Sequence, residues 1–227
     1  MILGPPESAP FLRRVGVIGD IHGEDAALAK ALDFFASNGA WDALLCTGDL
    51  PEKQGVGDSE RCCRQLEEAG VLTVRGNHDR WYFENAELRT ILGFEETFSE
   101  TAQAFLKSLP PFRVFDTPAG RLLLCHGIGR DDTSGIYRGG EDSDIEKALE
   151  RYGLPGPYRF MLSGHTHQRM VRPLANGLTL INAGTLQRGK EPCLSTIDFD
   201  LRQIQFYDIT PIAHAIRRAE TISLPVA

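Results

Sequence analysis

Eight polar residues follow short apolar segments of the chain and lie beside or near a glycine. They are Asp20, His22, Asp49, Asn77, His78, His126, His165 and His167. Imidazole nitrogens and carboxylate or amide oxygens are donors through which proteins bind divalent metal ions. A single histidine in such a place is more typical of a hydrogen-bonded turn residue, but so many polar residues in the same setting favour a metal site.

The spacing of these residues indicates how they could share a cation. One residue separates Asp20 from His22, and one separates His165 from His167. If each pair continues an extended strand, both side chains point to the same side, because side chains alternate along a strand. Neighbouring glycines permit sharp turns and a close approach of a ligand to the backbone. They are Gly19, Gly23, Gly48, Gly76, Gly127 and Gly164.

The donor types limit the identity of the metal. No cysteine belongs to the set, which excludes a structural zinc ribbon and favours Mn, Fe or Zn at a reactive site. The donors are too many for one tetrahedral ion, so we infer two ions that share a carboxylate. Two divalent ions bring a charge of about +4, which outweighs Asp20 and Asp49 and leaves a positive pocket that suits phosphate. Such a pair can ionise a bridging water for an in-line displacement.

Alternating strands and helices are expected to position the first half of the set. Segments 14–19, 43–46 and 71–74 are typical of buried strands, and 24–38 and 59–69 show helical periodicity. Strands that alternate with helices form largely parallel sheets, and ligands bind beyond the carboxyl ends of such strands.

The second half of the chain is predicted to be rich in strands. The segments concerned are 112–115, 121–125, 159–162, 170–172, 179–181, 193–199 and 203–207. Two packed sheets with helices outside would accommodate both halves. Segments 80–111, partly helical at 99–109, and 129–157 lack clear periodicity, and we expect them to form the walls of a cleft. His214 is predicted to be a structural residue in a C-terminal helical stretch.

Length and composition favour one domain over residues 1–227, with a loose tail at 1–10. No apolar run is long enough to span a membrane, and the first ten residues lack the features of a signal peptide. Five cysteines without framework spacing favour reduced thiols and a cytoplasmic location. The formal net charge of −7 argues against stable binding of nucleic acid.

Five blocks of the chain resemble the calcineurin-like metallophosphoesterases and follow the order of that family. They are Asp20-x-His22, Gly48-Asp49, Gly76-Asn77-His78-Asp79, His126-Gly127 and Gly164-His165-Thr166-His167. Segment 181–185 is also similar to the one that follows the last block in small bacterial members. The resemblance implies an α/β fold, a four-layer αββα sandwich of two mixed sheets flanked by helices, with a dinuclear metal site at the sheet rim.

The resemblance also implies roles for the matching residues. The first ion would be bound by Asp20, His22 and His167, and the second by Asn77, His126 and His165. Asp49 would bridge the two ions. His78 would lie near the leaving-group oxygen as a general acid or transition-state stabiliser.

The second block departs from the branch of protein phosphatases and diadenosine tetraphosphatases, in which Gly-Asp is followed by x-x-Asp-Arg. This chain has Glu52 and Lys53 in the last two places. The resemblance implies that Glu52 orients His78, while Lys53 contacts phosphate oxygens or remains a solvated surface charge. The fifth block, with its His-Thr-His, is closer to the compact bacterial phosphodiesterases, so the chain lies between two branches.

Other residues of the blocks and their surroundings are assigned by position. Arg75 is expected to contact the substrate phosphate or to remain a solvated surface charge, and Arg130 is expected to contact that phosphate. Asp79 is expected either to support His78 in catalysis or to hydrogen-bond to its own turn. Arg188 is expected to lie on a surface loop, with an approach to substrate as the alternative.

The predicted function is that of a metal-dependent phosphoesterase, which hydrolyses a phosphomonoester, phosphodiester or dinucleoside polyphosphate by in-line attack of a metal-bound hydroxide. The expected cofactors are two divalent ions, Mn, Fe or Zn, with Mn or Fe favoured. The expected partner is a phosphate-containing small molecule or a phosphoprotein. The alternative is a non-catalytic protein-binding scaffold on the same fold, as in a retromer subunit that resembles this family. Loss of a ligand would mark that alternative, and the sequence retains every one.

Overall fold

The structure is a computed structural model that describes residues 9–52, 57–84, 90 and 98–225. Its first sheet has the strand order β11-β10-β9-β1-β2-β3. Those strands are β1 (Arg14–Ile18), β2 (Ala43–Cys46), β3 (Leu72–Thr73), β9 (Cys193–Asp198), β10 (Gln203–Ile209) and β11 (Ile216–Ser223). β1, β2 and β3 run parallel, whereas β9 pairs antiparallel with β1 and with β10.

The second sheet has the strand order β4-β5-β6-β8-β7. Those strands are β4 (Phe112–Phe115), β5 (Arg121–Cys125), β6 (Tyr158–Ser163), β7 (Met170–Pro173) and β8 (Thr179–Asn182). β5, β6 and β8 run parallel, and the edge strands β4 and β7 are antiparallel to their neighbours. Both sheets are therefore mixed, as predicted.

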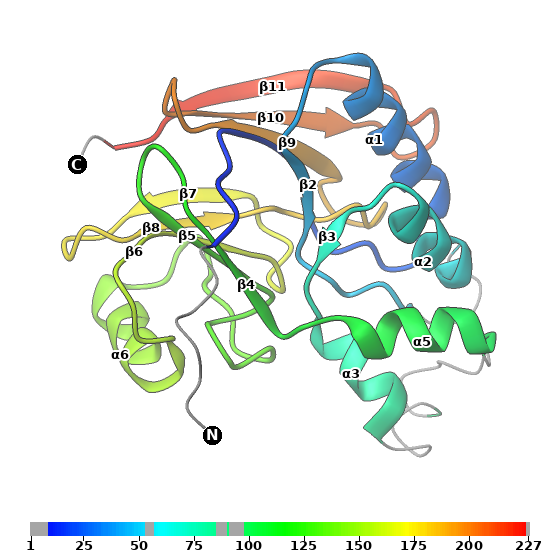
Figure 1. The fold of residues 1–227 in the computed structure, drawn as a ribbon, viewed down its shortest axis with the longest axis horizontal. Coiled ribbons are helices and arrows are strands. Elements are labelled where there is room, and N and C mark those ends of the chain that lie inside the picture. The colour runs from blue at the N-terminus through cyan, green and yellow to red at the C-terminus, as the bar shows by residue number, and fades with distance from the viewer. Residues whose placement is uncertain (1–8, 53–56, 85–89, 91–97, 226–227) are drawn as a thin grey trace.

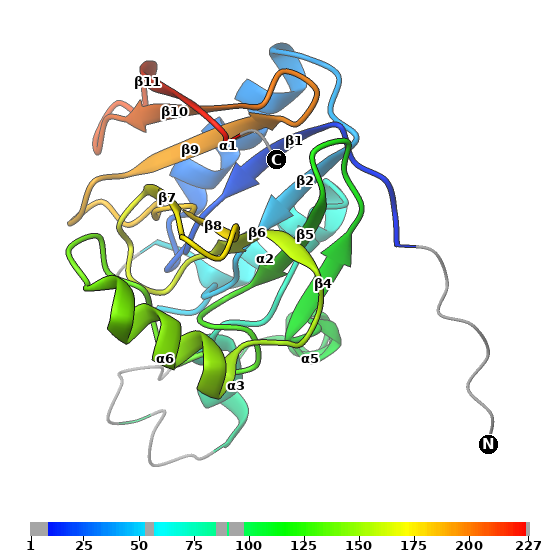
Figure 2. The same cartoon turned by 90° about the vertical axis from the view of Figure 1, so that its left-hand side faces the viewer.

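Helices cover the outer faces of the two sheets (Figures 1 and 2). They are α1 (Asp25–Ser37), α2 (Ser59–Glu68), α3 (Asn77–Glu84), α5 (Glu100–Ser108) and α6 (Asp142–Tyr152). α2 begins at Ser59, where the predicted helix 59–69 begins. Asp58, just before it, accepts a hydrogen bond from the amide of Arg61 over 2.8 Å and so caps the helix.

Three separate apolar clusters fill the spaces between layers. Leu28, Phe35 and Leu66 pack from α1 and α2 onto the outer face of the first sheet. A second cluster, which includes Val17 and Leu162, lies between the two sheets. The third cluster packs α6 against the outer face of the second sheet. Three interlayer cores define four layers, so the predicted αββα sandwich is confirmed.

Two helices were not predicted. α6 lies inside segment 129–157, although Ile145, Ala148, Leu149 and Tyr152 have helical spacing and pack on the second sheet. α3 begins at Asn77, a position that the sequence analysis assigned to the end of a strand.

The C-terminal region differs from the prediction of a helical stretch around His214. A turn precedes β11, which pairs antiparallel with β10 from Ile216 to Ser223. The local sequence is rich in helix-forming Ala, Arg and Glu, but pairing with β10 overrides this weak preference. In the described part of the chain, no helix combines the length and apolar character needed to cross a membrane. The predicted tail at 1–10 lies outside the described residues except for its last two positions.

Candidate metal centre

The eight polar residues follow five parallel strands of the two sheets. Members from the first sheet lie on the loops after β1 and β2 and at the start of α3 after β3, and those from the second lie on the loops after β5 and β6. A hydrogen bond joins the two sets: Thr185, which follows β8 of the second sheet, donates its hydroxyl to the carbonyl of Asp20, which follows β1 of the first, over 2.8 Å. The carboxyl ends of parallel strands from both sheets therefore meet at one rim.

Several of these side chains are presented by strained turns. His22, Asp49, His165 and His167 have φ angles of 48°, 53°, 65° and 59°. This left-handed region is uncommon for residues other than glycine, and such strain clusters at functional sites. The prediction of extended pairs is therefore wrong, because a turn rather than strand alternation aims each of these histidines.

The glycines beside these turns are required by close approach. A side chain at Gly164 would overlap the Asp20 carboxylate, and one at Gly76 would overlap the Asp49 carboxylate. This confirms the predicted reason for glycine next to the candidate ligands.

Three side chains meet in a first group. The Nε2 atoms of His22 and His167 lie 2.9 Å apart, and His167 Nε2 lies 3.3 Å from Asp20 Oδ2. Asp20 is fully buried, and in the described part of the chain its Oδ2 has no hydrogen-bond partner. A buried carboxylate oxygen facing two imidazole nitrogens is a suitable cradle for a cation.

Three other side chains meet in a second group. Asn77 Oδ1 lies 2.9 Å from His126 Nε2 and 2.9 Å from His165 Nδ1, and the two ring nitrogens are 3.3 Å apart. Asp49 stands between the groups, because its Oδ2 lies 3.4 Å from His126 Nε2 and 3.7 Å from His22 Nε2. The residues thus fit two ions with one shared carboxylate, and their N and O donors suit Mn, Fe or Zn.

Further residues hold the histidines in place. His126 Nδ1 lies 2.7 Å from the carbonyl of Thr47, whose hydroxyl donates to Asp20 Oδ1 over 2.9 Å. His22 Nδ1 lies 3.0 Å from Glu52 Oε2. Each contact fixes one ring nitrogen and turns Nε2 towards the shared centre, as is usual for metal-binding histidines. Thr47 was not predicted as a site residue, and its place directly before Gly48-Asp49 was the only signal in the sequence.

The electrostatics of the cluster favour positive charge. Burial disfavours a charged His126, but Asp49 and Asp20 outweigh it and raise its pKa to about 10. Burial alone would also raise the pKa of Asp49, yet the charge of His126 holds it well below its usual value. Burial, followed by the charge of His22, lowers the pKa of His167 to about 3 and keeps that ring neutral. The negative charges of these buried carboxylates favour a bound cation, and a divalent metal ion would be suitable.

His78 lies beside this cluster on the first turn of α3. Its amide donates to Asp49 Oδ1 over 2.9 Å, and its ring stands edge-on to His22 at a centroid distance of 4.8 Å. Ring atom Nδ1 is 3.3 Å from the carbonyl of Pro51. An acceptor there favours the tautomer protonated at Nδ1. Burial lowers the pKa of His78.

The two acidic residues assigned to catalysis make other contacts. Asp79 accepts hydrogen bonds from the amides of Gly76, Asp49 and Leu50. These contacts agree with the expectation that Asp79 hydrogen-bonds to its own turn. Burial and the charge of Asp49 raise the pKa of Asp79 to about 7, and the amides of Gly76 and Leu50 oppose that rise in part. Glu52 contacts His22, a candidate ligand, in addition to accepting from Gln187 over 3.2 Å.

Side-chain contacts are seen for two of the cations expected near the substrate, Arg130 and Arg188. Lys53 lies outside the described residues. The guanidinium of Arg130 lies over the ring of Phe112, 5.9 Å from its centroid, and the amide of Arg75 donates to the carbonyl of Pro110. Arg188 binds the buried carboxylate of Glu24 through its Nε and Nη2 atoms, each at 2.8 Å.

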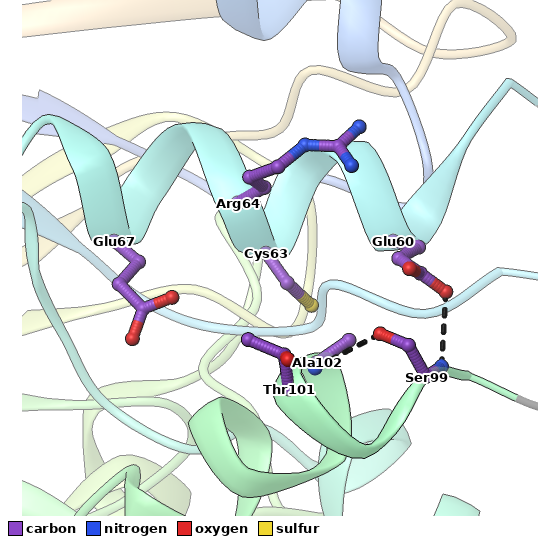
Figure 3. A pocket seen from close by; sticks show the side chains of 7 residues that line it. All are labelled: Glu60, Cys63, Arg64, Glu67, Ser99, Thr101 and Ala102. Atoms are coloured by element: carbon purple, nitrogen blue, oxygen red, sulfur yellow. Dashed lines mark hydrogen bonds between the residues drawn. The ribbon is translucent and has the colours of Figure 1, made fainter.

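Two pockets differ in their relation to this cluster. One of about 370 Å³ includes His167 in its lining. The other, of about 240 Å³, lies between α2 and α5, where Glu60 accepts from the amide of Ser99 and Cys63 points towards α5 (Figure 3). Burial raises the pKa of that thiol. None of the eight polar residues lines this second pocket.

Comparison with known proteins agrees with the geometry. A model of the calcineurin-like phosphoesterase family matches residues 13–169, more than half of the chain. No curated protein matches significantly. A metallophosphoesterase from Sphaerobacter thermophilus aligns with a TM-score of 0.63 and 18% identity, over 92% of this chain and 89% of that one. The phosphoesterase Yfce from E. coli aligns with a TM-score of 0.56 and 18% identity, over 93% and 100%.

A protein serine/threonine phosphatase from Saccharomyces cerevisiae is similar over 84% of this chain and 76% of that one, with a TM-score of 0.51 and 16% identity. At such identities the solved structures establish the fold, while the family match covers all five blocks. The chain therefore belongs to the calcineurin-like phosphoesterase family and is a metal-dependent hydrolase of phosphoric esters.

Proposed function

We propose that the chain hydrolyses phosphoric mono- or diesters by in-line displacement with water, at a site of two divalent metal ions. The observation that carries this proposal is the position of Asp49, whose Oδ2 lies 3.4 Å from His126 Nε2 and 3.7 Å from His22 Nε2. One carboxylate oxygen thus serves two groups of nitrogen and oxygen donors. Bound there, two divalent ions supply activation of the water and neutralisation of phosphoryl charge.

The residues proposed to hold the ions form three sets: Asp20, His22 and His167; Asn77, His126 and His165; and the shared Asp49. Glu52 adds a third carboxylate at 3.0 Å from His22 Nδ1, which the sequence analysis did not count. Two divalent ions of about +4 still exceed three carboxylates, so the occupied pocket attracts anions.

His78 is proposed to donate a proton to the leaving oxygen. The carbonyl of Pro51, 3.3 Å from Nδ1, favours that nitrogen as the protonated one in the neutral ring. Protonation of the ring then takes place at Nε2, which can pass the proton to a departing oxygen. Hydrogen bonding of the His78 amide to Asp49 couples the placement of this ring to the bridging residue.

The test measures metal content and hydrolysis together. Wild type is loaded separately with Mn²⁺, Fe²⁺ and Zn²⁺, and Asp49→Asn is compared with Asp33→Asn, a surface aspartate on α1. We expect about two ions per wild-type chain and a loss of activity of at least about a hundredfold in Asp49→Asn alone. Hydrolysis at the wild-type rate in that variant contradicts the mechanism, and near-zero metal in loaded wild type would favour the scaffold alternative.

The substrate class is tested by a panel. An aryl phosphodiester, diadenosine tetraphosphate and a phosphoserine peptide are compared by kcat/KM under one metal condition. The net charge of −7 supports a small molecule or phosphoprotein over a nucleic acid.

A further inference from the structure

A pocket of about 370 Å³ adjoins the candidate metal centre. Its lining residues are Arg138, Thr166, His167, Gln168, Lys190 and Glu191. His167 belongs both to this pocket and to the first group of donors, since its Nε2 lies 3.3 Å from Asp20 Oδ2. The volume is within the range of about 300–1,000 Å³ for small-molecule sites. A substrate at the metal centre can therefore extend into this pocket.

The pocket is lined by more positive than negative side chains, on a chain whose net charge is negative. Arg138 and Lys190 are cationic, and Glu191 is the one carboxylate among the lining residues. Neither cation is a candidate metal ligand, since the candidate ligands are imidazole, amide and carboxylate groups. This excess of positive charge favours the binding of an anionic group other than the scissile phosphate.

Arg138 is anchored in a way that leaves donors for a ligand. Its amide donates to Gln168 Oε1 over 3.1 Å, and its Nη2 donates to the carbonyl of Arg169 over 2.9 Å. Glu191 Oε2 lies 3.9 Å from the same Nη2 and is mostly exposed. A guanidinium carries five N–H groups, and within the described residues this side chain makes a single hydrogen bond. The others can bind a carboxylate or phosphate.

We propose that this pocket binds a second anionic group of the substrate, a carboxylate, while the scissile phosphate occupies the metal centre. The inference rests on the proposed hydrolysis of phosphoric esters and narrows its substrate class. Arg138 and Lys190 determine specificity for doubly anionic esters, and Glu191 limits it.

The experiment compares ω-carboxyalkyl phosphates of increasing chain length with their ω-hydroxyalkyl counterparts, each as monoester and methyl diester. The metal-loaded full chain is used, and the readout is the ratio of kcat/KM for the carboxyl and hydroxyl members. This ratio cancels any loss that a variant suffers on both. We expect wild type to prefer one carboxyl member by about tenfold. Arg138→Gln and Lys190→Gln should each lower that preference by about threefold, the scale of a partly exposed ion pair.

Glu191→Gln provides a test of sign, because removal of its charge should raise the same preference by about threefold. Lys147→Gln is the matched control, an exposed lysine on α6 that pairs with Asp144, and it should leave the ratio unchanged. Calorimetric binding of the corresponding carboxyalkyl and hydroxyalkyl phosphonates gives a readout independent of turnover.

The outcomes separate the two proposals. If wild type hydrolyses the hydroxyl members but shows no carboxyl preference at any chain length, the pocket assignment is overturned and the proposed function stands. A preference that survives both Arg138→Gln and Lys190→Gln also overturns the assignment. Hydrolysis of no member with any metal contradicts the proposed function itself.

Discussion

The carboxylate of Asp79 accepts a hydrogen bond from the backbone amide of Asp49 over 3.0 Å. It also accepts from the amides of Gly76 at 2.7 Å and Leu50 at 3.0 Å. These contacts tie the left-handed turn after β2 to the start of α3. Asp79 thereby positions the Asp49 side chain, which stands between the two groups of candidate ligands.

Asp79→Ala is expected to lower the free energy of unfolding by at least about 2 kcal/mol, because three buried amides lose their acceptor. Asp79→Asn keeps one acceptor oxygen and should recover part of this loss. Urea denaturation measures both changes, with Asp33→Asn as the surface control. The pH profile of kcat in Asp79→Asn should match wild type. Normal stability with a shifted profile would instead assign Asp79 to catalysis beside His78.

Metal affinity should increase with pH. In the metal-free protein Asp49 and Asp20 overcome the effect of burial and raise the pKa of His126 to about 10, so the ring is protonated at neutral pH. A metal ion binds the neutral ring and must release that proton. The dissociation constant should therefore fall by about tenfold per pH unit between about pH 6 and 8 for each proton released.

Calorimetry in buffers of different ionisation enthalpy counts the released protons. His214→Gln, which alters a histidine outside the cluster, should leave the pH dependence unchanged. An affinity that does not vary with pH would contradict a metal role for His126.

The sequence allowed the layers and the candidate ligands to be predicted because both depend on patterns along the chain. Apolar segments followed by Asp20, Asp49 and Asn77 indicate parallel strands with polar residues at their carboxyl ends. The backbone conformation could not be predicted in the same way. His22 and His167 have left-handed φ angles because they lie in turns, and nothing in an Asp-x-His or His-x-His pattern specifies such angles.

Contacts between distant residues were also beyond the sequence. Thr47 orients both Asp20 and His126, but only the meeting of the two sheets brings His126 to its carbonyl. The strand β11 was read as helical because its residues favour helices locally, while its pairing with β10 is a tertiary effect. By contrast, the helical spacing of Ile145 and Leu149 in α6 was present and overlooked.

Loss of His78 should depend on the leaving group. Without a proton donor, His78→Ala is expected to lower kcat by about 10²–10⁴-fold for alkyl esters, whose leaving oxygen needs a proton. The loss should be much smaller for nitrophenyl esters, which depart as stable anions. A plot of log kcat against leaving-group pKa should be steeper in the variant than in wild type. An equal loss across the series would restrict His78 to a positional role.

Glu24 and Arg188 form an ion pair that connects the loop after β8 with the start of α1. Glu24 is completely buried, and Arg188 reaches its two oxygens with Nε and Nη2 at 2.8 Å and with its amide at 2.8 Å. Arg188 lies on a surface loop, as expected, and its half-exposed guanidinium is paired with the buried Glu24. The pair also adjoins His22, two residues before Glu24.

Arg188→Ala should destabilise the protein by about 1–3 kcal/mol, because a buried carboxylate loses its partner while water reaches the half-exposed position of the arginine. Adding Glu24→Gln should restore part of that stability, since a neutral amide needs no cation. Arg188→Lys should be intermediate because it keeps the charge but not the two-pronged geometry. Urea denaturation of the four proteins of the double-mutant cycle measures the coupling. Additive losses would mean that the two side chains contribute independently, and that the loop after β8 is held by its other contacts, such as the hydrogen bond from Thr185 to Asp20.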